Sequence, residues 1–235
     1  YNLAVKELDK MRNAAGESVI IFGALNIDSK NFLKNSLIIE NNTQETVFYD
    51  KAKLVPFGEY MPFINLRSYF KISEQSNLFG WGFKRGKGPA LLTLPNGLKF
   101  VPLICYEAIF SNFLKPSVKN ADFILQITND AWFGKSIGPQ QHLAQLRVRA
   151  LEYGVPVIRV ANTGISAIID ANGNIIERIS VNRSGHLDSI IPSRKLSTVY
   201  GVYGNLIFVL LVLLTAVIAF LNKKFINLKN FRTQH

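Results

Sequence analysis

An uncharged stretch near the C-terminus constrains the fold of this chain more than any other feature. No Asp, Glu, Lys or Arg occurs between Val199 and Leu221, and from Leu206 onward only Thr215 interrupts the apolar run. About 20 predominantly apolar residues are enough to cross a bilayer as an α-helix. A buried core helix is the alternative, but a run of this length without a charged face is rare in soluble domains. We therefore predict a transmembrane helix over residues 199–221.

The residues on either side of this stretch predict its orientation. Tyr200 and Tyr203 stand at its upstream edge, where interfacial aromatic residues are expected, and a basic segment follows it. Positive charge is retained on the cytoplasmic side of a membrane, so the C-terminus is expected in the cytoplasm and the preceding domain on the opposite side. The chain then divides into a folded domain over 1–198, the helix over 199–221 and a basic cytoplasmic tail over 222–235.

Length and charge limit the remaining possibilities. The 235 residues can bury one large core, and the hydrophobic content of 48% with 18% charged residues is that of a globular domain with an apolar excess. The formal net charge of +11 suits anionic lipid headgroups beside a membrane. Nucleic acid is the usual alternative partner of a basic chain. We expect none, because the sequence has no base-stacking, zinc-finger or helix-turn-helix motif.

The first residues predict a helix that is already under way. The apolar residues Leu3, Val5, Leu8 and Met11 recur at roughly helical spacing, and the chain begins with Tyr1 and has no signal peptide. We expect this chain to be the C-terminal piece of a longer protein whose upstream part handles export or membrane insertion.

The central part of the chain alternates between short apolar runs and turn residues. Hairpin turns are expected at 41–43, at Asn96-Gly97 and at 171–174. A helix over 140–153 is expected to end at Gly154. This pattern predicts an α/β layered domain with a mixed sheet or two packed sheets. The strands are expected at 18–25, 36–40, 45–49, 91–95, 98–105, 123–128, 157–160, 165–170 and 175–179, and loops at 51–62 and 63–81.

The single cysteine, Cys105, follows the apolar run Phe100–Ile104 and precedes Tyr106-Glu107. A lone cysteine makes no internal disulfide, so it is either a small core residue or a working thiol. The preceding run is typical of a buried strand, and the polar residues after it indicate the start of a loop. A thiol at that junction is well placed to face a pocket.

A nucleophilic thiol needs a base and donors for the oxyanion that develops on its substrate. The chain has three histidines: His142 near a helix start, His186 in a turn-like stretch, and the terminal His235. A Cys-His pair is therefore weakly supported. A lysine ammonium can stabilise the oxyanion and a carboxylate can carry the proton, so a Cys-Lys-Glu set is the better physical candidate.

Four segments in order resemble the nitrilase (carbon-nitrogen hydrolase) superfamily and, within it, the bacterial apolipoprotein N-acyltransferase family. They are L-V-P-F-G-E-Y at 54–60, I-C-Y-E at 104–107, N-D-A-W-F at 129–133 and N-T-G-I-S at 162–166. The resemblance covers nearly the whole chain, the C-terminal helix included. It implies a four-layer α-β-β-α sandwich followed by one transmembrane helix.

The resemblance also implies a set of catalytic residues. Cys105 matches the nucleophile, Lys51 matches the catalytic lysine that stabilises the transition state, and Glu59 matches a supporting glutamate of the active site. Tyr106 and Glu107 match residues beside the nucleophile that the family needs for activity. Lys53 stands where the family often has histidine, and it receives no catalytic role.

The base glutamate of the family lies in a Trp-Pro-Glu-like segment that this sequence does not contain. Glu7 and Glu17 lack that context. Two alternatives remain open: the base belongs to a preceding segment, or this product is inactive.

The other residues of these segments have more ordinary interpretations. We expect Trp132 and Phe133 to line the substrate pocket, with a core position as the alternative, and Asn129-Asp130 to form an Asx turn. Arg149 and Glu152 have the i,i+3 spacing of a helical ion pair, and His142 is expected to be structural. The aromatic stretch 78–83 is a candidate lipid-contacting loop or, equally, a buried loop.

The resemblance implies a two-step acyl transfer at a bacterial inner membrane, in a full-length protein that crosses the membrane several times. The partners would be a phospholipid acyl donor and the N-terminal diacylglyceryl-cysteine of an apolipoprotein as acceptor, with no metal, cofactor or nucleic acid, and we expect a monomer. The alternatives are a membrane-tethered amidase or nitrilase-type hydrolase that uses water as the acceptor, and an inactive remnant or binding domain.

Overall fold

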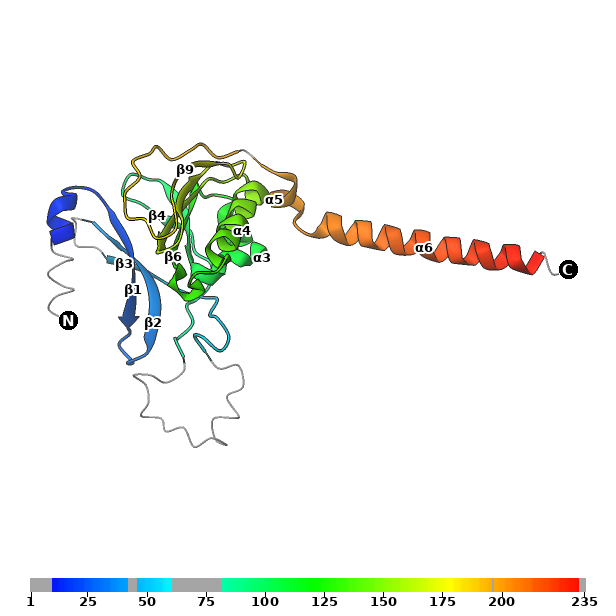
Figure 1. The fold of residues 1–235 in the computed structure, drawn as a ribbon, viewed down its shortest axis with the longest axis horizontal. Helices are drawn as coiled ribbons and strands as arrows, with labels where there is room; N and C mark the ends of the chain where they lie inside the picture. The colour runs from blue at the N-terminus through cyan, green and yellow to red at the C-terminus, as the bar shows by residue number, and fades with distance from the viewer. Residues whose placement is uncertain (1–9, 42–45, 61–81, 196, 233–235) are drawn as a thin grey trace, which may run out of the picture.

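The computed structural model describes residues 10–41, 46–60, 82–195 and 197–232, and it describes side chains as far as Asn222. Its strands form two sheets (Figure 1). The smaller sheet is an antiparallel meander, and the larger one is mixed, with parallel pairing at β5-β6-β7 and antiparallel pairing on both sides. The small sheet comprises β1 (Ile20–Ile27), β2 (Leu33–Glu40) and β3 (Thr46–Asp50), and the large sheet β4 (Leu92–Thr93), β5 (Lys99–Ile104), β6 (Phe123–Asn129), β7 (Val157–Asn162), β8 (Ser166–Ile169) and β9 (Ile175–Ile179).

Helices lie on the face of the large sheet that points away from the small sheet (Figure 1). The crossover from β5 to β6 contains the short η1 (Cys105–Ile109) and α3 (Ser111–Val118). The crossover from β6 to β7 contains η2 (Asp130–Phe133) and α4 (Gly138–Tyr153). Parallel strands require crossovers of this length, so both helices follow from the parallel pairing. The sequence pattern predicted α4 but not α3, which is short and has Pro116 in its interior.

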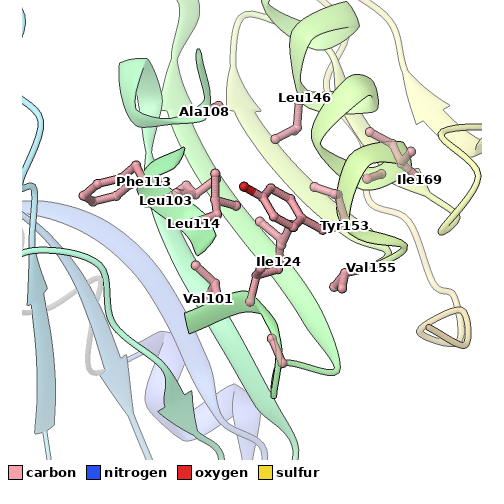
Figure 2. Packing of buried hydrophobic residues seen from close by; sticks show 14 of the residues in the cluster. Val101, Leu103, Ala108, Phe113, Leu114, Ile124, Leu146, Tyr153, Val155 and Ile169 are labelled. Atoms are coloured by element: carbon pink, nitrogen blue, oxygen red, sulfur yellow. The ribbon is translucent and has the colours of Figure 1, made fainter. Parts of the chain in front are cut away.

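Two apolar clusters hold these layers together. One lies between the sheets and includes Leu37 and Ile39 of β2, Phe100 of β5 and Phe123 of β6. The other fills the space between the large sheet and the two crossover helices, where Leu114 of α3 and its neighbours pack against the strands (Figure 2). The described residues therefore contain two packed sheets and one helical layer. The fourth layer expected from the resemblance is not seen as a separate layer in the described part, where residues 10–15 form a short helix before β1.

Three glycines form the turns and the helix end that the sequence predicted. Gly97 connects β4 to β5 with a φ of 86°, and Gly173 connects β8 to β9 with a φ of 78°. Gly154 ends α4 in a left-handed conformation with a φ of 65°. Glycine adopts these angles without the clash that a side chain would cause. The expected turn at 41–43 and the loop at 63–81 fall largely or wholly outside the described residues, as does most of the aromatic stretch 78–83.

The uncharged C-terminal stretch forms two helices instead of one. A short α5 (Val199–Tyr203) ends at Gly204, where φ is 57°, and a long α6 (Leu206–Arg232) extends away from the sheets (Figure 1). The helix thus starts later and ends later than the predicted 199–221. Among the described residues, no helix has both the length and the apolarity required of a membrane span. The large apolar side chains of α6 from Leu206 to Leu221 are exposed.

A group of hydroxyls joins α5 to the helical layer. The Ser111 side chain at the start of α3 donates to Glu152 of α4 at 2.7 Å and lies 2.8 Å from the Tyr200 hydroxyl of α5. The Tyr153 hydroxyl donates to the Ser111 carbonyl at 2.6 Å, and its ring meets the Tyr200 ring edge to face. Tyr200 also donates to Asn205, just before α6, at 3.2 Å. Tyr200 thus packs on the folded domain, and its expected place at a membrane interface stays a prediction.

Candidate active site

Cys105 occupies an unusual backbone position at the end of β5. Its φ of 50° lies in the left-handed region, which is uncommon for a residue with a side chain. The strand ends at Ile104, and η1 begins with Cys105 itself. The free thiol is partly buried and packs against the cluster between the sheets. A strained residue where a strand ends is a frequent feature of functional sites.

The carboxylate of Glu107 connects the Cys105 segment to the segment after β3. Its Oε1 accepts backbone N–H groups from Ala52 at 2.7 Å and Lys53 at 3.0 Å, and its Oε2 accepts the N–H of Ile104 at 2.8 Å. The Tyr49 hydroxyl donates to the same carboxylate at 3.0 Å. The residues beside Lys51 and beside Cys105 are thus fixed to one side chain, which is completely buried.

Burial sets the ionisation behaviour of this pair. Burial raises the pKa of Glu107, while its three backbone N–H donors and the Tyr49 hydroxyl act in the opposite direction. Burial also raises the pKa of Tyr49 well above its usual range, and the nearby Glu107 carboxylate adds to that shift. Tyr49 therefore keeps its proton and remains a donor to Glu107.

Lys51 and Glu59 form an ion pair with two short contacts. The Lys51 Nζ lies 2.7 Å from both carboxylate oxygens of Glu59, and the lysine side chain is only 1% exposed. Glu59 in turn accepts the backbone N–H of Val55 at 2.8 Å, which closes the L-V-P-F-G-E turn around it. A buried ammonium needs such a partner, because taking a charge out of water without compensation is costly. The structure therefore brings Lys51 and Glu59 together, the two residues that the family resemblance predicted as a lysine and a glutamate of the site.

The backbone of Lys51 is held on both sides by neighbouring segments. Its N–H donates to the Asn35 carbonyl at 2.8 Å, and its carbonyl accepts the N–H of Gly86 at 2.8 Å. A side chain at Gly86 would not fit, because its Cβ would lie 2.0 Å from the Asp50 carbonyl oxygen. The close approach of this glycine therefore permits the hydrogen bond to the Lys51 carbonyl.

A second buried polar network reaches Cys105 from the other side. Gln126 of β6 donates to the Cys105 carbonyl at 2.9 Å, and His142 of α4 has its Nε2 3.1 Å from the same oxygen. Asp130 and Arg159 form an ion pair at 2.5 Å beneath them, and both side chains are inaccessible to water. Burial acts to raise the pKa of Asp130, but hydrogen bonding from His142 and the Arg159 charge lower it overall. Asp130 is therefore ionised.

The aromatic residues of the site lie in different surroundings. The Tyr106 ring meets the Phe110 ring edge to face at 5.0 Å. Trp132 is 86% exposed and so does not belong to the core, whereas Phe133 lies against the His142 ring at 5.8 Å. The expected role of Trp132 and Phe133 in substrate binding stays a prediction.

Other expectations have clear outcomes. Asn129 accepts the N–H of Ala131 at 3.2 Å, which confirms the Asx turn, and Arg149 pairs with Glu152 at 2.9 Å, which confirms the helical ion pair. His142 is buried, as a structural histidine would be. Of the glutamates without family context, Glu7 lies outside the described residues and Glu17 is exposed in the turn before β1.

Tyr49, Gln126 and Arg159 were not predicted as site residues. The signal was nevertheless present, because Gln126 and Arg159 are the long polar residues within the apolar strand segments F-I-L-Q-I and V-I-R-V-A. Buried polar side chains require hydrogen-bond partners, so a polar residue within such a strand indicates a network. Tyr49 is less conspicuous, since tyrosine is common in strands.

The chain belongs to the carbon-nitrogen hydrolase family, whose members match residues 3–200. It is 43% identical over 189 residues to the apolipoprotein N-acyltransferase of Rhizobium rhizogenes, a match that covers 78% of this chain and 35% of that protein. The protein of the same name from Rickettsia prowazekii is 40% identical over 184 residues, covering 78% and 36%. That from Rickettsia typhi is 37% identical over 218 residues, covering 88% and 43%. The chain thus spans between about a third and somewhat less than half of the length of these relatives.

Solved structures of an amidase from a Nesterenkonia species share the fold. One superimposes with a TM-score of 0.54 at 16% identity and covers 74% of this chain and 62% of the amidase. A variant of that amidase in complex with butyramide gives a TM-score of 0.52 at 16% identity, with the same coverage. Together with the family match over residues 3–200, these similarities support the nitrilase-superfamily α/β fold.

We predict that Glu107→Gln destabilises the domain. In Glu107 one carboxylate oxygen accepts from Ala52 and Lys53, and the other accepts from Ile104. The glutamine amide has only one oxygen, so the backbone N–H groups on its other side would face an NH2 group that cannot accept a hydrogen bond. Leaving a buried donor without an acceptor costs about 1–3 kcal/mol. Chemical denaturation of both proteins measures the difference in the free energy of unfolding.

The matched control is Glu17→Gln, which makes the same chemical change at an exposed site. It should change the free energy of unfolding by less than about 0.5 kcal/mol. Equal stability of Glu107→Gln and the unmodified protein would contradict the role assigned to the carboxylate.

Proposed function

We propose that this chain carries the catalytic domain of an N-acyltransferase in which Cys105 is the nucleophile. The acyl donor is a membrane phospholipid, and the acceptor is the α-amine of the N-terminal S-diacylglyceryl-cysteine of an apolipoprotein. The name of the relatives at about 40% identity supports this substrate class. The observation that carries the proposal is the Glu107 carboxylate, which ties the segment of the Lys51–Glu59 ion pair to the strained Cys105.

The first half of the proposed reaction loads the acyl chain onto the enzyme. The Cys105 thiolate attacks the ester carbonyl of the phospholipid, and the carbonyl oxygen becomes an oxyanion. Collapse of this intermediate forms a thioester and breaks the ester bond, so that the lysophospholipid leaves with its alcohol oxygen protonated. The thiol proton must first pass to a base, and that proton can serve the leaving alcohol.

The second half transfers the chain to the acceptor. The neutral α-amine attacks the thioester carbonyl, an amide forms, and the Cys105 thiolate departs, while the proton that the amine loses passes through the base back to the thiolate. A thioester reacts readily with amines and survives as long as water is kept away. The competing family reaction, hydrolysis, would use water in place of the amine at this step.

The Lys51 ammonium is proposed to stabilise the oxyanion in both halves. It is a cation already removed from water, so its interaction with a developing negative charge is stronger than in solution. Glu59 holds it with two contacts and keeps its Nζ in place. Tyr106 and Glu107 support the nucleophile from the residues that follow it, and Trp132 and Phe133 are proposed to contact substrate.

We predict that the full gene product incubated with phospholipid accumulates an acyl adduct on Cys105. Intact-mass and peptide mass spectrometry should show the mass of one fatty acyl chain, and hydroxylamine should remove it because it is a thioester. Cys105→Ala should carry no adduct, because it lacks the sulfur. An adduct on that variant, or turnover of small amides without any lipid adduct, would refute the acyltransferase assignment.

Replacing Lys51 should slow acylation without removing the nucleophile. Losing one oxyanion stabiliser typically costs about a factor of 10²–10³ in rate, and Lys51→Met should show a loss of this order in single-turnover thioester formation. Lys34→Met is the matched control, since Lys34 also forms a 2.7 Å ion pair, with Asp50. Unchanged acylation by Lys51→Met would remove Lys51 from the mechanism.

We also propose that the apolar C-terminal helix anchors the domain in the bilayer that holds both substrates. Support comes from the absence of charge over 199–221 and from the exposed apolar side chains of α6. The basic residues after it favour a cytoplasmic C-terminus and an extracytoplasmic catalytic domain.

The anchor proposal predicts that the chain floats with liposomes in a density gradient. Leu210→Lys combined with Leu214→Lys should reduce the floating fraction, since each charge at a helix centre opposes insertion by about 2.5–3.5 kcal/mol. Both leucines are exposed, so the domain core is unaffected. The control is Ile176→Lys on β9, which is similarly exposed. Flotation of the double variant at the unmodified level would contradict an anchoring role for α6.

A further inference from the structure

Two long polar residues lie side by side in the interior of the large sheet. Gln126 of β6 and Arg159 of β7 are register partners, and Gln126 also pairs with Leu103 of β5, two residues before Cys105. Both polar side chains are buried. The sheet register therefore brings a guanidinium and an amide to the strand end where the thiol lies.

Arg159 determines which end of the Gln126 amide faces Cys105. A guanidinium can only donate hydrogen bonds. Arg159 donates through Nη1 to the Oε1 of Gln126 and through Nε to the Ile165 carbonyl at 2.9 Å. Because Oε1 is turned toward Arg159, the amino group of Gln126 points the other way and donates to the Cys105 carbonyl at 2.9 Å.

Asp130 and His142 complete this arrangement. Arg159 donates through Nη2 to Asp130, whose other oxygen lies 3.1 Å from the Nδ1 of His142. An ionised carboxylate only accepts, so the Nδ1 of His142 carries a proton, while its Nε2 lies 3.1 Å from both the Gln126 amino nitrogen and the Cys105 carbonyl oxygen. Gly164 allows the approach, because a Cβ there would lie 2.2 Å from Asp130 Oδ2.

The network ends on the backbone group of a strained residue. Relaxation of Cys105 from its left-handed conformation would rotate its carbonyl away from Gln126 and change the direction in which the thiol, which now packs against the cluster between the sheets, leaves the backbone. The hydrogen bond from Gln126 opposes that relaxation.

We propose that Arg159 is a positioning residue that acts through Gln126 to hold Cys105 in the conformation that presents its thiol for attack. The inference rests on the proposed function only in taking Cys105 as the nucleophile. Arg159 itself touches neither the substrate nor the reacting sulfur.

Alkylation of Cys105 by iodoacetamide tests this proposal without any lipid substrate. The full chain is labelled across a range of pH, and peptide mass spectrometry follows the modification of Cys105. Rates are compared on the alkaline plateau of each profile, where the thiol is fully ionised, so that a difference reports position and not protonation. Arg159→Lys keeps the positive charge but loses the planar guanidinium that donates to three groups at once. It should lower the plateau rate about tenfold, the effect of one lost hydrogen bond of this kind.

Gln126→Glu is the second variant and isolates the bond to Cys105. The carboxylate has nearly the same shape and still accepts from Arg159, but it has no N–H for the Cys105 carbonyl. It should lower the plateau rate to a similar extent. Arg149→Lys is the matched control, because Arg149 is also largely buried and ion-paired but contacts Ile109 and Glu152 instead. Its plateau rate should stay at the unmodified level.

Each outcome decides the question. The proposal is overturned if Arg159→Lys or Gln126→Glu has the same plateau alkylation rate as the unmodified protein. It is also overturned if Arg149→Lys lowers that rate as much as Arg159→Lys does, which would indicate a general loss of stability. Where acyl transfer is active, the variants should lower the maximal rate of thioester formation and leave the half-saturating phospholipid concentration unchanged. Failure to form any thioester refutes the proposed function alone, since alkylation needs no acyl donor.

Discussion

The buried carboxylate of Glu107 is the interaction on which the arrangement of this site depends. It accepts hydrogen bonds from two segments about fifty residues apart, the one after β3 and the one at the end of β5. Hydrophobic packing brings the two sheets together, but it is not directional and leaves their relative register open. Hydrogen bonds to a single carboxylate specify that register to within a few tenths of an ångström. The Lys51 ammonium and the Cys105 thiol therefore derive their relative placement from a residue that performs no chemistry itself.

Cys105 is restrained from both sides of its peptide unit. On the N-terminal side the N–H of Ile104 is bound by Glu107, and on the C-terminal side the Cys105 carbonyl is bound by Gln126. The first restraint connects the thiol to the small sheet, and the second connects it to β6, β7 and α4. A backbone conformation that is unfavourable in isolation persists when the surrounding structure determines it in this way.

Much of the fold could be predicted from hydrophobic periodicity and turn residues, while the site could be predicted only in part. The strands β5 to β9, the helix α4 and the glycine turns at Gly97 and Gly173 follow local rules, because their sequence patterns are local. Lys51, Glu59 and Glu107 came from family resemblance and not from any local pattern. The Gln126–Arg159 pair depends on the register between strands that are over thirty residues apart, which no local pattern encodes. The short α3 was missed because Pro116 masks its helical pattern.

The hydroxyl of Tyr200 joins the start of the long helix to the layer that covers the sheet, because it lies 2.8 Å from the Ser111 hydroxyl on one side and donates to Asn205 on the other. Ser111 opens α3, which directly follows the short helix that begins at Cys105. A change in the tilt of α6 would therefore be transmitted through the Tyr200 and Ser111 hydroxyls to the β5–β6 crossover, which begins at Cys105.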